Sequence, residues 1–209
     1  MKIKISIIPI MLLILLWILS PQLKAVSIIE DEWIKVITAN KEKLANSPDD
    51  IKARFRLAVA YANLGDLKSA MNELKNLQKL DGKKMTREII REYELEYKKN
   101  TENLFTLNYL AFAYYANGQF NKSKIFFQKI IELDAENIWA YNYLALVQGI
   151  LEDYDEAIKT LKKAIKIEKN NYTYLILGLI YYQKGQLFKA MWYMGKSGNI
   201  GLDFLNDES

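Results

Sequence analysis

Apolar and polar positions alternate along residues 49–209 with the spacing of amphipathic helices. In residues 104–117 the apolar side chains share one helical face, at i, i+3, i+4 and i+7; these are Leu107, Leu110, Ala111 and Tyr114. From about Asn121 a second helix is expected to turn its apolar residues toward the same core: Ile125, Phe127, Ile130 and Ile131. No proline follows Pro48 to interrupt the helices. The pattern predicts an all-α chain.

One combination of residues recurs at a period of about 34 residues over residues 104–204, and a fainter copy lies upstream at residues 51–84. A small residue, an aromatic residue and a glycine stand at fixed offsets in three copies: Ala58, Tyr61 and Gly65; Ala111, Tyr114 and Gly118; Gly178, Tyr181 and Gly185. Another copy keeps Ala145 but has Gln148 and Glu152 in the other two places. Such a period predicts stacked repeats, each burying its apolar face against its neighbours.

This framework resembles the tetratricopeptide repeat, a unit of two antiparallel helices. The resemblance implies a tetratricopeptide-like helical-hairpin solenoid, a right-handed superhelix of antiparallel helix pairs. The expected parts are a signal peptide or membrane anchor at 1–25, a capping helix at 26–48, repeat units at 49–84, 104–137, 138–170 and 171–204, an inserted helix at 85–103, and a polar tail at 205–209. A degenerate half-repeat at 85–103 is the alternative to an inserted helix.

A second stripe runs along the first helix of each unit, two, five, nine and twelve residues into it, and most of it is apolar. Its members are Lys52, Phe55, Val59 and Ala62; Phe105, Asn108, Phe112 and Tyr115; Trp139, Asn142, Leu146 and Gly149; and Tyr172, Leu175, Leu179 and Tyr182. A helix that is apolar on nearly all sides is either fully buried or carries a binding face. The resemblance implies that this stripe lines the concave groove of the array.

The expected partner is a protein or peptide segment with apolar side chains. Asn108 and Asn142 stand 34 residues apart and could each pair with an extended backbone, or could simply keep the helices soluble. Related arrays that hold an acidic C-terminal tail use lysines and arginines on this stripe, and here only Lys52 is basic. The predicted contact residues are Phe105, Asn108, Phe112, Tyr115, Trp139, Asn142, Leu146, Tyr172 and Tyr182.

Composition narrows the chemistry. The chain has no cysteine and no histidine, which excludes thiol nucleophiles, disulfides, the usual zinc sites and histidine bases. Two acidic clusters, 30–32 and 152–156, stand at expected helix starts, where acids suit the positive end of the helix dipole. We therefore predict no catalytic residue, no metal site and no cofactor.

The N-terminal 25 residues differ in composition from the helical repeats. Lys2 and Lys4 precede an almost entirely apolar run, residues 5–19, and a short polar exit that ends at Ala25. This order is typical of a secretory signal peptide, although Leu23 is large for a cleavage site and leaves a retained membrane tether open. Cleavage after Ala25 would lower the formal charge from +4 to +1 by removing three lysines, which disfavours nucleic-acid binding.

These features predict a non-catalytic scaffold or adaptor that is exported to the cell envelope, the periplasm or the exterior, either released or anchored to the cytoplasmic membrane. One alternative is a membrane-anchored assembly factor of an envelope or secretion complex. Another is binding of cell-wall carbohydrate through the aromatic residues of the groove. The partner, pathway and oligomeric state stay open.

The C-terminal end carries Met191, Trp192, Tyr193 and Met194, with no further repeat to cover them. Solenoid ends usually need a polar cap. The following residues include Ile200, Leu202, Phe204 and Leu205, and we expect this tail to fold back over the last helix. The alternative is an open end that self-associates.

Overall fold

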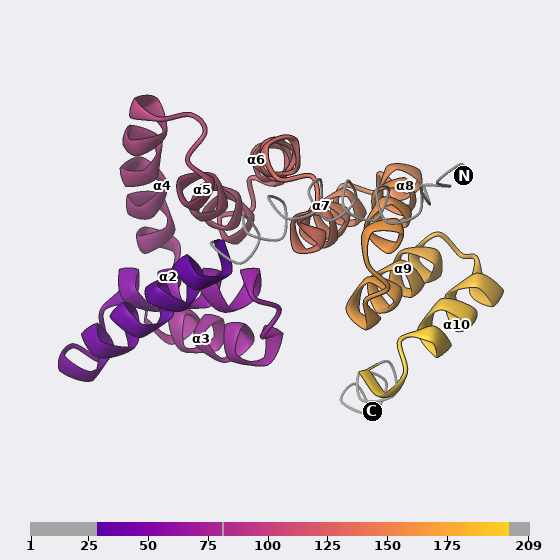
Figure 1. Cartoon of the computed structure of the whole chain (residues 1–209), viewed down its shortest axis with the longest axis horizontal. Coiled ribbons are helices and arrows are strands. Elements are labelled where there is room, and N and C mark those ends of the chain that lie inside the picture. Colours follow the sequence, from indigo (N-terminus) through magenta and orange to yellow (C-terminus); the bar gives the residue numbers. More distant parts are fainter. Residues whose placement is uncertain (1–28, 81, 201–209) are drawn as a thin grey trace, which may run out of the picture. The chain divides into compact units, whose positions relative to one another are not determined.

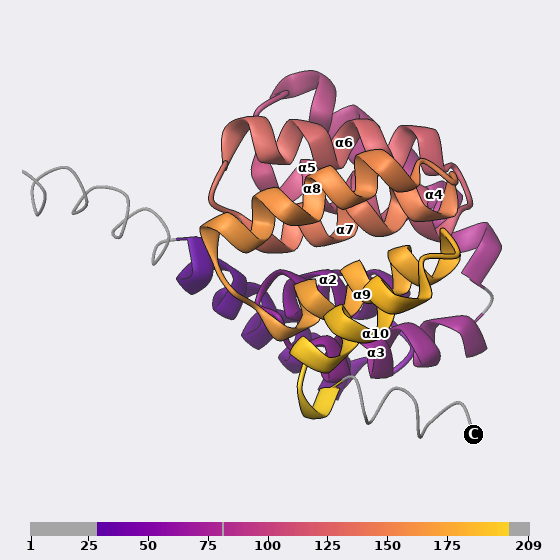
Figure 2. The same cartoon turned by 90° about the vertical axis from the view of Figure 1, so that its right-hand side faces the viewer.

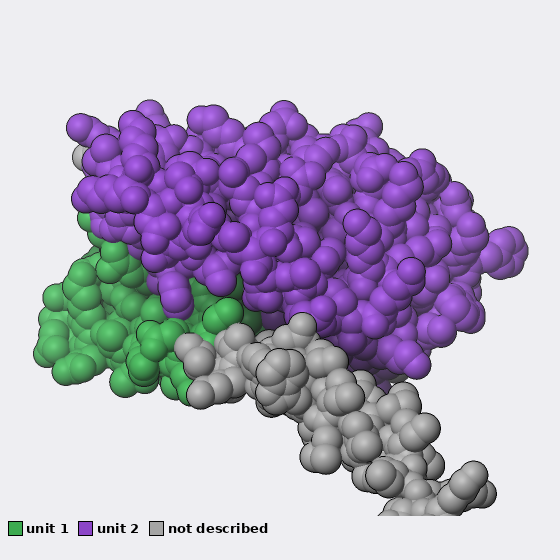
Figure 3. Space-filling view, turned by 45° about the horizontal axis from the view of Figure 1, so that its top comes forward, with its two compact units in different colours: residues 1–73 green, residues 74–209 purple. Residues whose placement is uncertain are grey.

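The computed structural model describes residues 29–80 and 82–200, and every regular element in those ranges is a helix. The chain separates into two compact units, residues 1–73 and residues 74–209 (Figure 3). Their boundary falls inside α3, Leu67–Lys79. The N-terminal run that predicts a signal peptide lies outside the described residues.

The first unit contains a helix over residues 29–46 and α2, Ile51–Asn63. Asp50 caps α2: its carboxylate accepts a hydrogen bond from the Ala53 amide at 2.8 Å and pairs with the Lys43 ammonium at 2.7 Å. The Lys43 contact and the backbone amide hold the pKa of Asp50 below its usual value. Arg54 on α2 pairs with Glu73 on α3 at 2.9 Å and thereby ties the two helices together.

Within residues 82–200, the second unit contains a row of seven helices (Figures 1 and 2). They are α4, Gly82–Lys99; α5, Leu104–Ala116; α6, Phe120–Leu133; α7, Ile138–Ile150; α8, Tyr154–Ile167; α9, Asn171–Gln183; and α10, Leu187–Lys196. Three hairpins form from α5 and α6, α7 and α8, and α9 and α10, and each hairpin packs on the next through α6 with α7 and α8 with α9. The all-α stack of helical hairpins is confirmed.

The inserted helix expected at 85–103 corresponds in position to α4, which packs against α5. Tyr93 of α4 stacks on Tyr109 of α5 with ring centroids 4.6 Å apart. The Tyr114 hydroxyl donates a hydrogen bond to the Glu94 carboxylate. Both contacts fix α4 on the start of the hairpin row.

Short polar side chains start the first helix of each hairpin. Asn103, Asn137 and Asn170 accept hydrogen bonds from backbone amides of α5, α7 and α9 at 2.9, 3.0 and 2.9 Å. Such a cap satisfies one of the amides that have no partner within the helix. Each first helix therefore begins at a defined residue, which sets the register of its side chains.

The turn inside each hairpin needs a residue with positive φ. Gly118 and Gly185 supply it at +73° and +76°, and Glu152 adopts +63° in the same place. In each turn the amide of the residue that directly follows donates a hydrogen bond to the carbonyl of the aromatic position, for example Gln119 to Tyr114 at 2.8 Å. Glu152 thus takes up a conformation that costs a residue with a Cβ atom about 1 kcal/mol.

The core lies between the helices of each hairpin and between neighbouring hairpins. Leu107, Phe127 and Val147 belong to one buried cluster, and Ala157, Leu161 and Leu177 to the next. Ile125, which the pattern turned toward the core, is half exposed, so that assignment was wrong. The reason is the helical rotation: Phe127 and Ile130 take the buried face, and Ile125 falls outside it.

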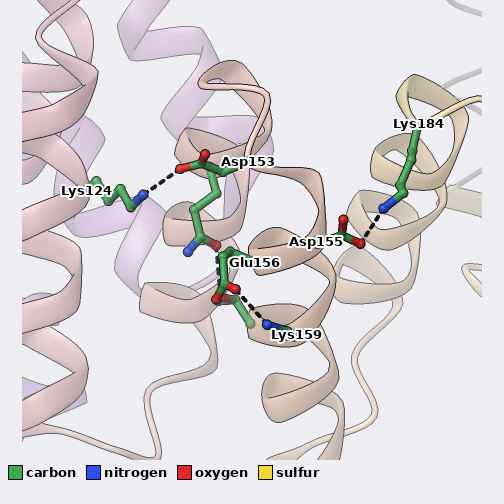
Figure 4. Close-up of polar contacts among 8 residues, drawn as sticks. Lys124, Asp153, Asp155, Glu156, Lys159 and Lys184 are labelled. Atoms are coloured by element: carbon green, nitrogen blue, oxygen red, sulfur yellow. Dashed lines mark hydrogen bonds and ion pairs between the residues drawn. The ribbon is translucent and has the colours of Figure 1, made fainter.

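Lysines on adjacent helices pair with the acids at the start of α8. Figure 4 shows Lys124 of α6 on Asp153 at 2.5 Å and Lys184, which caps the end of α9, on Asp155. Glu156 pairs with Lys159 on its own helix at 2.7 Å. These acids therefore tie three successive hairpins together, in line with the structural role that the sequence indicates for them.

Candidate functional site

The second stripe of the second unit comes from α5, α7 and α9, which are the first helices of the three hairpins. All nine predicted contact residues lie on these helices: Phe105, Asn108, Phe112 and Tyr115 on α5; Trp139, Asn142 and Leu146 on α7; Tyr172 and Tyr182 on α9. The asparagine caps start the three helices at equivalent places, and this brings equivalent stripe positions onto successive helices.

Aromatic rings link the three helices. Phe112 on α5 meets Tyr143 on α7 edge to face, with centroids 4.8 Å apart. Tyr143 lies 6.4 Å from Trp139, which in turn lies 5.9 Å from Tyr172 on α9. We call Phe112, Tyr143, Trp139 and Tyr172 the aromatic cluster. Offset and edge-to-face pairs of this kind add stability beyond the area that they bury.

The members of the stripe differ in exposure. Tyr115 and Tyr182 are 41% and 57% exposed, although large aromatic residues are usually well covered. Phe105, Trp139, Leu146 and Tyr172 are partly buried. The stripe is therefore open to solvent at Tyr115 on α5 and at Tyr182 on α9.

Phe112 contacts both the aromatic cluster and the buried core. Besides Tyr143 it contacts the buried ring of Phe127 edge to face at 5.3 Å, so one side of the ring belongs to the core between α5 and α6. Leu146 likewise packs against the buried cluster that includes Leu177. A change at either position would disturb the core as well as the exposed surface.

The two asparagines of the stripe do not act alike. Asn108 is buried, and its side-chain amide donates to the Leu104 carbonyl of its own helix at 2.8 Å. Asn142 is 1% exposed, and neither its Nδ2 nor its Oδ1 finds a hydrogen-bond partner among the described residues. The 34-residue spacing therefore places two amides in equivalent positions but leaves only Asn142 with unused donor and acceptor capacity.

The aromatic surface is uncharged at neutral pH. Burial raises the pKa of the Tyr143 phenol, with a smaller contribution from Tyr172, and burial also raises the pKa of Tyr115. The stripe itself carries no lysine or arginine on α5, α7 or α9. Within the described ranges no group of acidic side chains is arranged to hold a metal ion. The chemistry available here is apolar contact with few hydrogen bonds.

Sequence reasoning missed Tyr143, because it stands six residues into its unit and outside the stripe pattern. Only its position next to Asn142 and four residues after Trp139 could have drawn attention to it. Sequence reasoning also missed the capping asparagines. Their signal was visible, because Asn103, Asn137 and Asn170 each precede an apolar helical segment at the repeat spacing.

Comparison with known proteins confirms the repeats. Two family models described as tetratricopeptide repeat match the chain, one at residues 51–84 and 107–137 and the other at residues 126–159. A tetratricopeptide repeat-containing protein of Methanocaldococcus jannaschii is 30% identical over 141 residues. That match covers 63% of this chain and 23% of the relative, so the chain spans only a minor part of that protein's length.

Solved structures share the fold. The chain superposes on a solved structure of MamA MSR-1 with a TM-score of 0.51 and 16% sequence identity. The match covers 82% of this chain and 96% of the MamA chain. A chain of the APC/C hetero-tetramer Cut9–Hcn1 gives 0.52 at 16% identity, covering 79% of this chain and 28% of that one. At these identities the likeness concerns the fold, a tetratricopeptide-like solenoid of helical hairpins.

No helix in the described ranges combines the length and the apolar character needed to cross a membrane. The predicted tether, residues 5–19, lies outside those ranges.

Proposed function

We propose that this chain is a non-catalytic scaffold that binds an apolar segment of a partner protein along the second stripe of α5, α7 and α9. Tetratricopeptide folds generally serve protein–protein interaction, which gives the coarse function. The observation that carries the finer proposal is the chain of partly buried rings across three successive helices, together with the exposed tyrosines Tyr115 and Tyr182 on the same stripe. Exposed apolar patches mark interaction sites.

The chemistry of the stripe favours an apolar segment over an acidic one. An acidic tail would need cationic partners, and the stripe offers none on these three helices. Aromatic side chains at the centre of an interface are each worth roughly 2 kcal/mol when a partner fully covers them. Trp139 is the central candidate, because it contacts rings both on its own helix and on α9.

The same chemistry argues against a glycan. Sugar binding by aromatic rings needs several hydrogen-bonding side chains around the rings. Asn108 uses its amide on its own helix, which leaves Asn142 as the one stripe amide with free capacity, and Asn142 is almost completely buried. An apolar peptide segment asks for less, because it can bind through side-chain contacts with the rings and needs no hydrogen bond from Asn142.

Selection from a displayed library of short random peptides tests the class of ligand. We expect the protein to enrich peptides with large apolar side chains, and the enriched peptides to lose binding to Trp139→Ala. Ile125→Ala is the matched control, because Ile125 is a half-exposed apolar residue on α6, away from the stripe. Enrichment of acidic peptides, or retention on purified cell-wall glycan with no peptide enriched, would contradict the proposal.

The place of action is a second part of the proposal: export, with residues 1–25 acting as a signal peptide or a tether. Support comes from the two lysines followed by the apolar run 5–19. N-terminal sequencing of the protein from fractionated cells distinguishes the two forms. A mature chain that starts at Val26 indicates cleavage, and an intact N-terminus in the membrane fraction indicates a tether. An intact chain in the cytoplasmic fraction would contradict export.

A further inference from the structure

The last helix of the second unit exposes an apolar surface at the end of the row. Leu187, Phe188, Met191 and Trp192 are 56%, 91%, 71% and 55% exposed. They recur at i, i+1, i+4 and i+5 along α10, so they form one contiguous stripe. We call these four residues the terminal face.

The preceding hairpin shows what this surface is built to contact. α8 and α10 are equivalent second helices, with Ala157 matching Ala190, so Ile158 is the counterpart of Met191. Ile158 is buried, in the cluster where α8 packs on α9. Met191 has no following helix above it in the described ranges, and it lies open.

The counterparts of Phe188 and Trp192 on α8 are the exposed, charged Asp155 and Lys159. The terminal face therefore combines an uncovered stacking position, Met191, with two aromatic residues at places where α8 carries charge.

The chain turns sharply where α10 ends. α8 has 14 residues and α10 has 10. Gly198 adopts φ +62°, a value that favours glycine, and the buried Ser197 hydroxyl donates to the Met194 carbonyl at 2.6 Å. A turn therefore ends α10 about one helical turn before the equivalent point in α8, and residues 199–200 are helical again after it.

Residues 201–209 have the composition and the length to cover the terminal face. They carry three large apolar residues, Leu202, Phe204 and Leu205, and three acids, Asp203, Asp207 and Glu208. Lysines on α10 flank the face: Lys196 lies 3.7 Å from the centre of the Trp192 ring, and Lys189 lies near Tyr181. Nine extended residues reach about 30 Å, and α10 is about 15 Å long.

We propose that residues 201–209 of this chain bind back onto the terminal face, with their apolar residues against Phe188, Met191 and Trp192 and their acids toward Lys189 and Lys196. A segment tethered next to its site competes at a high effective concentration with any second copy. The end of the row is then closed within one chain, and the second stripe of α5, α7 and α9 is left as the surface for a partner.

A single fluorescent label tests this contact, because the chain contains no cysteine. Asn206→Cys, labelled with bimane, places a dye that tryptophan quenches on contact next to Leu205. We expect quenched emission that does not depend on protein concentration and that rises when Trp192→Phe removes the quencher. Trp139→Phe, which changes a tryptophan on α7, is the matched control and should leave the emission unchanged.

A second variant tests whether the apolar residues of the tail hold the dye near Trp192. Phe204→Asp combined with Leu205→Asp should restore the emission while the helical circular dichroism stays unchanged. Quenching that disappears on dilution would assign the terminal face to a second copy and overturn the proposal. Emission that is insensitive to Trp192→Phe would overturn it as well.

Discussion

The first helices of the second unit carry two apolar faces, and only one of them is satisfied within the chain. On one face Leu107, Leu110 and Ala111 are completely buried against neighbouring helices. On the second stripe of the same α5, Phe112 is partly buried and Tyr115 is 41% exposed. Apolar character alone therefore does not separate core from binding surface. The difference lies in whether a neighbouring helix is placed to cover the residue.

The aromatic cluster shows how the two roles meet. Phe112, a stripe residue, contacts both the buried Phe127 and Tyr143 of the aromatic cluster, so the stripe is continuous with the core. Such continuity holds the rings in place before a partner arrives, and preorganisation lowers the entropic cost of binding. We expect each substitution to lower the free energy of unfolding more, the more of the side chain the protein itself buries. The two faces should therefore differ in their effect on stability.

The largest expected effect is on the buried face. Leu107→Ala should lower the free energy of unfolding by about 3 kcal/mol, because it removes a fully buried side chain and leaves a cavity. Tyr115→Ala should cost under about 1 kcal/mol, since much of its ring is already in water. Urea unfolding followed by circular dichroism measures both. Equal losses would show that Tyr115 is a core residue.

Two glycines of the first helices, one on the buried face and one on the second stripe, give a further comparison of the two faces. A Cβ atom on Gly178 would lie 3.0 Å from the Met194 backbone nitrogen and 3.2 Å from the Ala190 carbonyl oxygen, so α9 and α10 would have to separate. We expect Gly178→Ala to cost about 2 kcal/mol.

Gly149, on the second stripe, is the comparison for Gly178. Its added Cβ would meet the Cδ1 atom of Ile180, at the end of a flexible side chain that can change rotamer. Gly149→Ala should therefore cost clearly less than Gly178→Ala in the same urea unfolding experiment. The reverse order would mean that α7 and α9 pack more rigidly than α9 and α10.

The smallest effect concerns the hairpin turns. Glu152→Gly should raise the free energy of unfolding by up to about 1 kcal/mol, because glycine relieves the positive φ of +63°. Part of this gain is offset by the greater freedom of glycine in the unfolded chain. Gly118→Ala is the mirror control: its added Cβ meets nothing within 4 Å, so only the backbone cost of φ +73° remains. Thermal unfolding that shifts downward for Glu152→Gly would contradict this reasoning.

Much of the fold could be predicted from the sequence, because its signals are local and repeated. The repeated glycine positions predicted the hairpin turns, and the helical face predicted over residues 104–117 matches α5, Leu104–Ala116. The exposure of individual residues could not be predicted. Ile125 and Ile130 lie on one amphipathic helix, but only Ile130 is covered, because covering depends on the rotation of α6 against its neighbours.

The candidate site divides in the same way. Periodicity placed Asn108 and Asn142 in equivalent positions, but the hydrogen bond from Asn108 to Leu104 and the unpaired amide of Asn142 depend on side-chain geometry that spacing does not encode. Tyr143 of α7 joins the aromatic cluster through its contact with Phe112 of α5. A stripe that is defined along one helix cannot reveal a contact between two helices.

The most direct test of the central claim is the affinity of a selected apolar peptide for three variants, measured by isothermal titration calorimetry. The account predicts that Trp139→Ala weakens binding roughly 30-fold, the equivalent of about 2 kcal/mol for a central aromatic anchor. Tyr182→Ala should weaken it less, and Ile125→Ala should leave it unchanged, with all three proteins retaining the wild-type circular dichroism. Unchanged affinity for Trp139→Ala, or a loss of affinity in Ile125→Ala instead, would contradict binding along the second stripe.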